Sequence, residues 1–209
     1  MTISLSDAGK RYNREWIFRH FTQQFEQGSA YAITGPNGSG KSTLLQCIAG
    51  AIQLSEGKLT YIDRQTPVAD DKSHECISLA TPYLELIEEM TAMELLHFQQ
   101  TFKPFRKGPG FPEMLTRVRL SNAAHKQIRY YSSGMKQRMK LLLAFFADTP
   151  VLLLDEPSTN LDAEGVDAYK ALLQSETGGR LLIISSNDPN EYEGCQEVIS
   201  IYDFKPALR

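Results

Sequence analysis

The stretch GPNGSGKST, from Gly35 to Thr43, decides the fold of this chain. It fits the pattern G-x-x-x-x-G-K-[ST], in which glycines let the backbone wrap a phosphate chain and point its amides inward. A predicted buried strand, AYAIT (residues 30–34), precedes it, and a predicted helix, KSTLLQCIAG (residues 41–50), follows it. This order of strand, loop and helix predicts a phosphate-binding loop, or P-loop, at the entrance of an α/β unit.

Each part of the P-loop has a role that follows from its residue type. Lys41 supplies a positive charge for the β- and γ-phosphates of a nucleotide, and the N-terminus of the following helix favours an anion. The Ser42 hydroxyl is suited to Mg²⁺, which prefers oxygen ligands. The predicted nucleotide-binding set from this motif comprises Gly35, Pro36, Asn37, Gly38, Ser39, Gly40, Lys41, Ser42 and Thr43.

A second motif, VLLLDEP at residues 151–157, supports the first. A wholly apolar strand is typical of a parallel sheet buried on both faces, and it would deliver Asp155 at its carboxyl end, where such sheets bind ligands. Asp155 is then suited to bind Mg²⁺, and Glu156 is suited to act in catalysis by polarising an attacking water. The alternative, a core strand that merely ends in surface carboxylates, is disfavoured by the presence of the P-loop.

The order of predicted elements indicates one α/β domain over residues 1–209. Short alternating runs before residue 30 predict an N-terminal antiparallel β-subdomain, and the βαβ alternation after residue 148 predicts a mostly parallel sheet. Residues 84–147 have helical spacing and predict an inserted helical lobe, interrupted by an exposed loop at residues 103–113. The α/β core is thus expected from residues 1–80 and 148–209.

Composition excludes several other classes of protein. The net charge of −3 gives no general basic field, so we expect no nucleic acid partner. The longest apolar run, LLLAFFA at residues 141–147, is far shorter than the ~20 residues of a membrane span. The start of the chain lacks the pattern of a secretory signal, and Cys47, Cys76 and Cys195 are too widely spaced for a metal motif. We therefore expect a cytoplasmic protein that reaches a membrane only by docking onto another chain.

Two further segments carry a resemblance to a known family. YSSGMKQR at residues 131–138 resembles the LSGGQ-type signature of ATP-binding cassette (ABC) ATPases, and STNLD at residues 158–162 resembles their D-loop. With the P-loop and LLLDEP, four motifs follow the order of that family over nearly the whole chain. The resemblance implies an ATP-binding and ATP-hydrolysing subunit of an ABC transporter that uses ATP and Mg²⁺. It also implies a head-to-tail homodimer or heterodimer that holds two ATP molecules between P-loop and signature.

The signature itself has the chemistry of an anion site, because Ser132, Ser133 and Gly134 are expected at the start of a helix. The resemblance adds these residues and Asp162 of the D-loop to the nucleotide-binding set, with a simple helix cap as the alternative for the serines. It also implies an aromatic residue that stacks on adenine. Tyr12 lies at the matching place, whereas Trp16 is expected to pack beneath the β-subdomain.

The sequence departs from the family at three places. In the signature, Tyr131, Ser133 and Met135 replace the usual Leu, Gly and Gln, although the helix start remains. Where the family has a Gln that senses Mg²⁺, this chain has Pro82, which has no side-chain donor or acceptor, beside the hydroxyl of Thr81. Loss of that Gln puts the link between the metal and the helical lobe in doubt.

The third departure is Asn187, which stands where the family has a His beside the γ-phosphate. Asn can donate from its NH₂ group, but it is shorter than His and cannot become cationic. We therefore expect Asn187 to be a catalytic residue, and we expect hydrolysis of ATP to be slow. Alternatively, Asn187 is the N-cap of a helix in NDPNEYEG, a role that Pro189 supports, and the two roles are compatible.

The resemblance implies a transport ATPase that drives a separate transmembrane permease subunit from the cytoplasmic face of the membrane. The family receives this partner at the junction of core and lobe, which here is the apolar segment from Tyr83 to Ile87, although Leu84 and Leu86 suit core packing equally. The alternative is a soluble ABC ATPase of the assembly-factor type. An unrelated P-loop kinase is disfavoured because it would need neither the signature nor the D-loop.

Overall fold

The computed structural model describes residues 1–205 and contains two β-sheets. The strands are β1 Thr2–Tyr12, β2 Glu15–Glu26, β3 Ala30–Thr34, β4 Glu56–Asp63, β5 Thr66–Val68, β6 Ile77–Ala80, β7 Val151–Asp155, β8 Leu181–Ser185 and β9 Glu197–Ser200. The helices are α1 Lys41–Ile48, α2 Ser73–Cys76, α3 Ala92–Phe102, α4 Phe111–Arg117, α5 Ser133–Phe146 and α6 Ala163–Glu176. Short 3₁₀ turns include η4 Pro189–Glu191 and η5 Ile201–Phe204.

The central sheet has the order β6-β7-β8-β3-β9, and every neighbouring pair in it is parallel. The second sheet, β2-β1-β4-β5, is antiparallel. The predicted α/β fold of a P-loop NTPase with a parallel sheet and an antiparallel β-subdomain is therefore confirmed. The β-subdomain draws β4 and β5 from after α1 as well as β1 and β2 from the N-terminal segment.

The apolar strands of the parallel sheet are buried on both faces. In β7, Val151 and Leu153 belong to one hydrophobic cluster, whereas Leu152 and Leu154 belong to the other. Successive side chains of a strand point to opposite faces, so both sets must be apolar when both faces are covered. This arrangement explains why the strand reads as an unbroken apolar run in the sequence.

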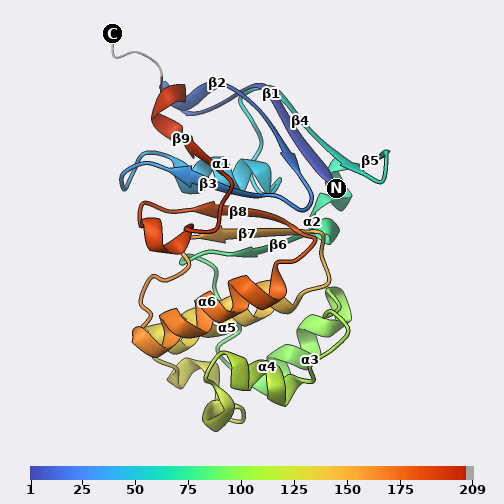
Figure 1. The fold of residues 1–209 in the computed structure, drawn as a ribbon, viewed down its shortest axis with the longest axis vertical. Coiled ribbons are helices and arrows are strands. Elements are labelled where there is room, and N and C mark those ends of the chain that lie inside the picture. Colours follow the sequence, from blue (N-terminus) through green and yellow to red (C-terminus); the bar gives the residue numbers. More distant parts are fainter. Residues whose placement is uncertain (206–209) are drawn as a thin grey trace.

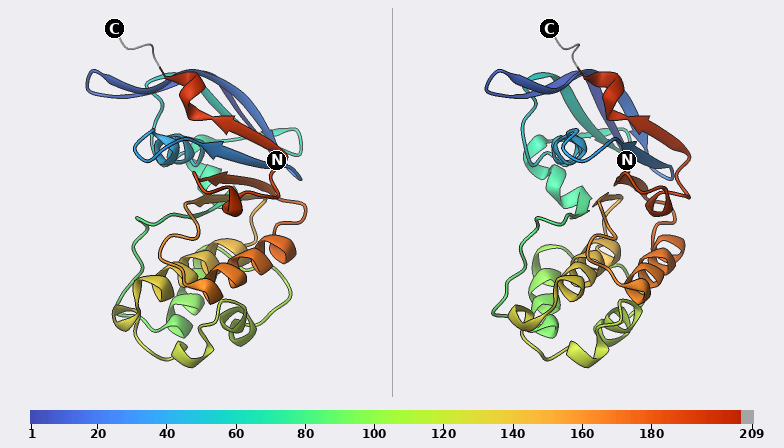
Figure 2. Two further views of the ribbon diagram at one scale, coloured as in Figure 1. Left: turned by 60° about the vertical axis from the view of Figure 1, so that its left-hand side comes forward. Right: turned by 90° about the vertical axis from the view of Figure 1, so that its left-hand side faces the viewer.

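The elements stack in layers around the two clusters (Figure 1). Helix α1 lies between the antiparallel sheet and one face of the parallel sheet, while α5 and α6 cover the other face. Helices α3 and α4 lie beyond α5 and form with it a helical lobe that shares one hydrophobic cluster with β7 and β8. Figure 2 shows from two further directions that this lobe and the antiparallel sheet lie on opposite sides of the parallel sheet.

Local signals set the ends of the lobe helices. Thr91 and Glu94 form a reciprocal capping box at the start of α3, and Ser132 caps α5 by accepting a hydrogen bond from Met135 N at 3.2 Å. The loop predicted at residues 103–113 makes more contacts and has more regular structure than expected. Arg106 N donates to Phe146 O at 2.8 Å, and α4 already begins at Phe111, with Pro112 in its first turn.

Two further findings concern the apolar character of the helices and the state of the cysteines. Across residues 1–205, none of the helices combines the length and the apolar character that a bilayer crossing requires. The three cysteines are free, and Cys47 is buried.

Candidate active site

The P-loop connects β3 to α1 and has a backbone that glycine makes possible. Gly38 and Gly40 have φ values of 76° and 101°, in the left-handed region that other residues rarely adopt. A Cβ atom at Gly40 would lie 2.2 Å from Cγ2 of Ile17, so the β1–β2 hairpin packs directly against the loop. The loop is thus held open from the side of the β-subdomain, with the N-terminus of α1 beneath it.

Lys41 is the charged residue at the centre of the loop. Its side chain is only 3% exposed, and its Nζ donates to Gly35 O at 2.8 Å and to Pro36 O at 3.3 Å. The same Nζ lies 3.8 Å from Oε1 of Glu156. A buried ammonium therefore stands between the loop backbone and the catalytic carboxylate that the sequence predicted, where it can meet a phosphate oxygen.

Asp155 ends β7 at the carboxyl edge of the sheet. Burial raises the pKa of its carboxyl group, while hydroxyls of Ser185 and Ser42 and the charge of Lys41 oppose this rise. Its Oδ1 atom is buried and has no hydrogen-bond partner within residues 1–205. An unpaired carboxylate oxygen beside the Ser42 hydroxyl fits a hard cation such as Mg²⁺.

The chain alone does not complete such a metal site. Nowhere in the described residues do three acidic, histidine or cysteine side chains converge on one point. Mg²⁺ is commonly held by one or two carboxylates together with water and the phosphates of a substrate. The residues present therefore fit a cation that arrives with a nucleotide.

Glu156 follows Asp155 with an unusual backbone conformation. Its φ is 41°, in the left-handed region, and its N–H donates to Ser185 O of β8 at 2.8 Å. Strain of this kind in a non-glycine residue costs of order 1–3 kcal/mol and needs support from its surroundings. The resulting turn leaves the Glu156 side chain 31% exposed, near Lys41.

Asn187 lies beside the P-loop. Its Nδ2 atom donates to Oδ1 of Asn37 at 3.2 Å, which joins the end of β8 to the loop. The prediction that Asn187 also caps the following turn is wrong, because Asp188 is the cap and its Oδ1 accepts from Asn190 N at 2.9 Å. Since Pro189 is the first residue of η4, the capping position falls on Asp188.

The segment at the metal-sensing position is held by its own contacts. The Thr81 hydroxyl is buried and accepts a hydrogen bond from Tyr83 N at 3.1 Å. Lys140 of α5 donates to Pro82 O at 2.5 Å. Pro82 is therefore tied through its backbone to the helix that carries the signature.

The two aromatic candidates for adenine differ in exposure. Tyr12 is 48% exposed in the β1–β2 hairpin, with Lys10 Nζ 5.0 Å from its ring centre. Trp16 was expected beneath the β-subdomain, but it belongs to neither hydrophobic cluster of the described residues. Its half-buried ring instead stacks against the guanidinium groups of Arg11 and Arg19, at 5.4 and 4.4 Å. Tyr12 thus offers the freer ring face.

The signature residues meet the D-loop of their own chain. A Cβ atom at Gly134 would lie 2.7 Å from Asn160 O, while Ser132 and Ser133 are exposed at the start of α5. Asp162 caps α6 by accepting from Gly165 N at 2.9 Å, and its Oδ2 lies 3.8 Å from Arg138 Nη2. This carboxylate is therefore engaged within the chain.

The predicted residues thus form two separate groups. One group gathers the P-loop, Asp155, Glu156 and Asn187 at the carboxyl ends of β3, β7 and β8. The other joins the signature to the D-loop. Sequence reasoning missed Glu191, a buried carboxylate that accepts a hydrogen bond from Ser158 N at 2.7 Å. Only its place four residues after Asn187 could have drawn attention to it.

Comparisons with known proteins agree with this geometry. A family model described as ABC transporter matches residues 18–159. The uncharacterized ABC transporter ATP-binding protein YybJ of Bacillus subtilis is 28% identical, over 96% of this chain and 89% of its own. The lantibiotic transport ATP-binding protein SrtF of Streptococcus pyogenes is 26% identical, over 99% and 89%. The dimeric post-hydrolysis structure of the ATP-binding cassette MJ0796, bound to ADP and Pi, superimposes with a TM-score of 0.79 at 22% identity, covering 99% of this chain and 97% of that one.

Proposed function

The chain belongs to the ABC transporter family, and on that basis we propose that it binds and hydrolyses ATP to drive a separate membrane subunit. The observation that carries this proposal is the meeting of Lys41, Asp155 and Glu156 at one edge of the parallel sheet. A cation for phosphate, a buried carboxylate with an unpaired oxygen and a partly exposed carboxylate are the groups that phosphoryl transfer to water requires.

Each residue has a role in this reaction. The P-loop amides and Lys41 bind the β- and γ-phosphates, and Ser42 and Asp155 hold Mg²⁺. When bound, Mg²⁺ neutralises negative charge on those phosphates. Glu156 orients the attacking water and accepts a hydrogen bond from it, which aligns the water with the γ-phosphate. Tyr12 stacks on the adenine ring without selecting strongly among bases.

We propose that the active unit is a dimer. The signature serines Ser132 and Ser133 are exposed at a helix start, and Gly134 packs against the D-loop of the same chain. A helix terminus of this kind favours an anion, which a second copy or a related subunit would supply as its own bound ATP. The dimeric cassette MJ0796 bound to ADP and Pi supports this arrangement by fold similarity.

The contact between Asn187 and Asn37 bears on the rate of ATP hydrolysis that we expect. Asn187 is near enough to the P-loop to donate to a phosphate, yet in this arrangement its NH₂ group is engaged with Asn37. Asn also lacks the reach and the positive charge of His. Loss of one positioned donor to developing negative charge commonly costs about 10²- to 10³-fold in rate. We propose slow hydrolysis for this reason.

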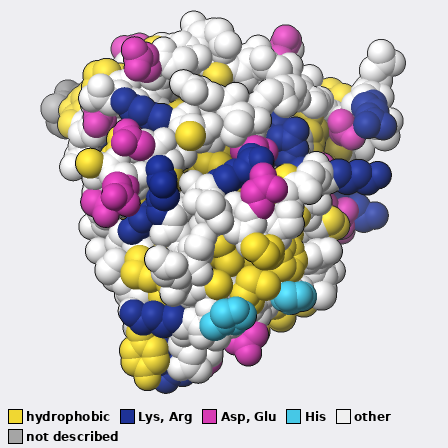
Figure 3. Space-filling model, turned by 60° about the horizontal axis from the view of Figure 1, so that its bottom comes forward, with side chains coloured by type: hydrophobic (Ala, Val, Ile, Leu, Met, Phe, Trp, Pro, Cys, Tyr) yellow, Lys and Arg dark blue, Asp and Glu magenta, His cyan; other side chains and the backbone are white. Residues whose placement is uncertain are grey.

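The proposed docking surface for the membrane subunit is the segment from Tyr83 to Ile87. Tyr83 is 78% exposed, Leu84 and Ile87 are also exposed, and Leu86 packs into the lobe core. Three exposed hydrophobic side chains within five residues are typical of a protein interface. Figure 3, which turns the bottom of the molecule in Figure 1 forward, shows that hydrophobic side chains also gather near two histidines on that face.

This docking places the protein on the cytoplasmic face of the membrane. The name of SrtF, a lantibiotic transport ATP-binding protein, supports a transport role. A soluble assembly factor of the same family is the alternative function, and the exposed Tyr83 segment favours transport over it.

The first prediction concerns Glu156. Replacing Glu156→Gln removes the acceptor charge but preserves shape, so kcat for ATP should fall by about 10²- to 10⁴-fold. Binding of ATP, measured by equilibrium titration, should stay close to that of the unaltered protein because Lys41 and the P-loop are unchanged. Equal turnover of both proteins in a phosphate-release assay would remove Glu156 from the mechanism.

The second prediction concerns Asn187. Asn187→His should raise kcat because it restores a longer donor that can become cationic, whereas Asn187→Ala should lower kcat by about tenfold or less, because the NH₂ group of Asn187 is already engaged with Asn37. Steady-state kinetics with ATP and Mg²⁺ give both values. If Asn187→Ala changes neither turnover nor nucleotide affinity, the residue does not contact phosphate.

The third prediction concerns docking. An integral membrane protein should co-purify with the chain from solubilised membranes, and Tyr83→Glu should abolish this because it places a charge in an apolar interface. Tyr202→Glu is the matched control, since Tyr202 is 56% exposed in η5 at the other end of the molecule. Recovery of soluble partners alone, or equal recovery with Tyr83→Glu, would favour the assembly-factor alternative.

A further inference from the structure

A six-residue segment after β8, Ser186 to Glu191, lies between the P-loop and the D-loop. At one end, Asn187 donates to Asn37 of the P-loop. At the other end, the carboxylate of Glu191 accepts hydrogen bonds from Ser158 of the D-loop. The segment therefore contacts both of the loops that the proposed reaction uses.

Hydrogen bonds within the segment make it rigid. Ser186 Oγ accepts from Asp188 N at 2.9 Å, and Asp188 Oδ1 accepts from Asn190 N at 2.9 Å. Glu191 N donates to Asp188 O at 3.0 Å, which closes the single turn of η4. Short-range hydrogen bonds therefore link the part of the segment that holds Asn187 to the turn that ends at Glu191.

Glu191 is buried, with 5% of its surface exposed. Its Oε1 accepts from Ser158 N at 2.7 Å and from Ser158 Oγ, and its backbone oxygen accepts from Tyr169 OH of α6 at 2.8 Å. Within residues 1–205, no basic side chain lies within 4.0 Å of this carboxylate. A buried polar group needs hydrogen-bond partners, so the two donors of Ser158 are the main support of this buried side chain.

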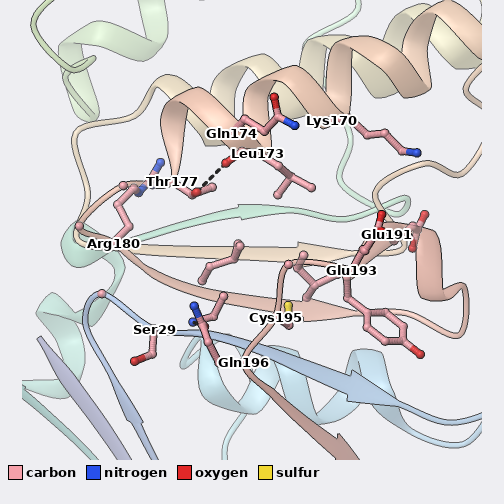
Figure 4. Close-up of a pocket in the computed structure, with 18 of the residues that line it drawn as sticks. Ser29, Lys170, Leu173, Gln174, Thr177, Arg180, Glu191, Glu193, Cys195 and Gln196 are labelled. Atoms are coloured by element: carbon pink, nitrogen blue, oxygen red, sulfur yellow. Dashed lines mark hydrogen bonds between the residues drawn. The ribbon is translucent and has the colours of Figure 1, made fainter.

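The surroundings of Glu191 differ from those of Glu193, a carboxylate two residues further along the chain. Figure 4 shows Glu191 and Glu193 beside a cavity of about 560 Å³ that lies between α6 and the strands β3 and β8. Glu193 is exposed, whereas Glu191 is buried and reaches the D-loop. Substitution of Glu193 is therefore a matched control for substitution of Glu191, because only Glu191 is buried and bonded to the D-loop.

The D-loop is also fixed on its other side, by the signature helix. The buried Gln137 of α5 donates from Nε2 to Pro157 O at 2.9 Å, and Gly134 packs against Asn160 O. Ser158 lies between these contacts. The D-loop is thus held between α5 on one side and Glu191 on the other, and loss of either support frees it to move.

We propose that Glu191 is a positioning residue that fixes the D-loop relative to the P-loop of the same chain. Through the hydrogen bond between Asn187 and Asn37, the segment that ends at Glu191 links the arrangement of the P-loop to the position of the D-loop. The kinetic consequence rests on the proposed ATPase function, whereas the placement of the D-loop does not. Glu191 touches no reacting atom in this account, and it holds the D-loop through Ser158.

Steady-state kinetics and amide hydrogen exchange of the full chain test this proposal. Glu191→Ala should lower kcat for ATP by about 10- to 100-fold, since a misplacement of about 1 Å costs up to about 10²-fold in rate. The KM for ATP should change by less than about threefold, because the P-loop is intact. Glu191→Gln should recover most of the rate, because its amide oxygen still accepts from Ser158 N.

Hydrogen exchange reports the placement without activity. Amides of residues 158–162 should exchange faster in Glu191→Ala than in the unaltered chain, and Glu193→Ala should leave both exchange and kcat unchanged. The double variant Ser158→Ala/Glu191→Ala should be no slower than Glu191→Ala alone, because both changes remove the same contact between Ser158 and Glu191.

The outcomes separate this proposal from the proposed function. If the unaltered chain hydrolyses no ATP but residues 158–162 exchange faster in Glu191→Ala, the ATPase function fails and the positioning role stands. If the unaltered chain is active and Glu191→Ala leaves exchange and kcat unchanged, the positioning role is overturned. Equal loss of kcat in Glu191→Gln and Glu191→Ala, with exchange as in the unaltered chain, would also overturn it.

Discussion

A parallel sheet that is buried on both faces can carry charged groups only where its strands end, and the rest of this structure depends on that constraint. The side chains of β7 and β8 divide between two hydrophobic clusters, one under α1 and one under α5 and α6. The buried Arg180 accordingly lies at the amino edge, directly before β8, whereas the acidic groups lie at the carboxyl edge. Asp155, Glu156 and Asn187 all lie there, and the P-loop follows β3 at the same edge.

The electrostatics of this edge favour an anionic ligand that brings its own cation. Lys41 is buried against the loop carbonyls and lies near Glu156, while Asp155 keeps a buried oxygen without a partner in the described chain. Burial raises the pKa of Asp155, and the negative charge of Glu191 adds to this rise. A divalent cation would stabilise the ionised carboxylate, so metal and nucleotide binding should support each other.

Much of the fold could be predicted from the sequence because its strongest constraints are local. The unbroken run of β7 indicates a strand covered on both faces, and the P-loop glycines indicate a backbone with positive φ. Contacts between side chains of different elements could not be predicted from the sequence in the same way. The prediction for Trp16 was wrong because Arg11 and Arg19, which lie in the same hairpin, stack on its ring. A buried Glu191 reads like any surface acid, since its partner Ser158 is 33 residues away.

In the proposed dimer, the P-loop of one chain and the signature of another close around ATP. This arrangement is tested most directly by sedimentation equilibrium of Glu156→Gln, in which bound ATP persists, with and without ATP and Mg²⁺. The account predicts a monomer that becomes a dimer when ATP and Mg²⁺ are added, and a loss of this change when Ser132 is replaced by a bulky acidic residue. A chain that stays monomeric while saturated with ATP would contradict the account.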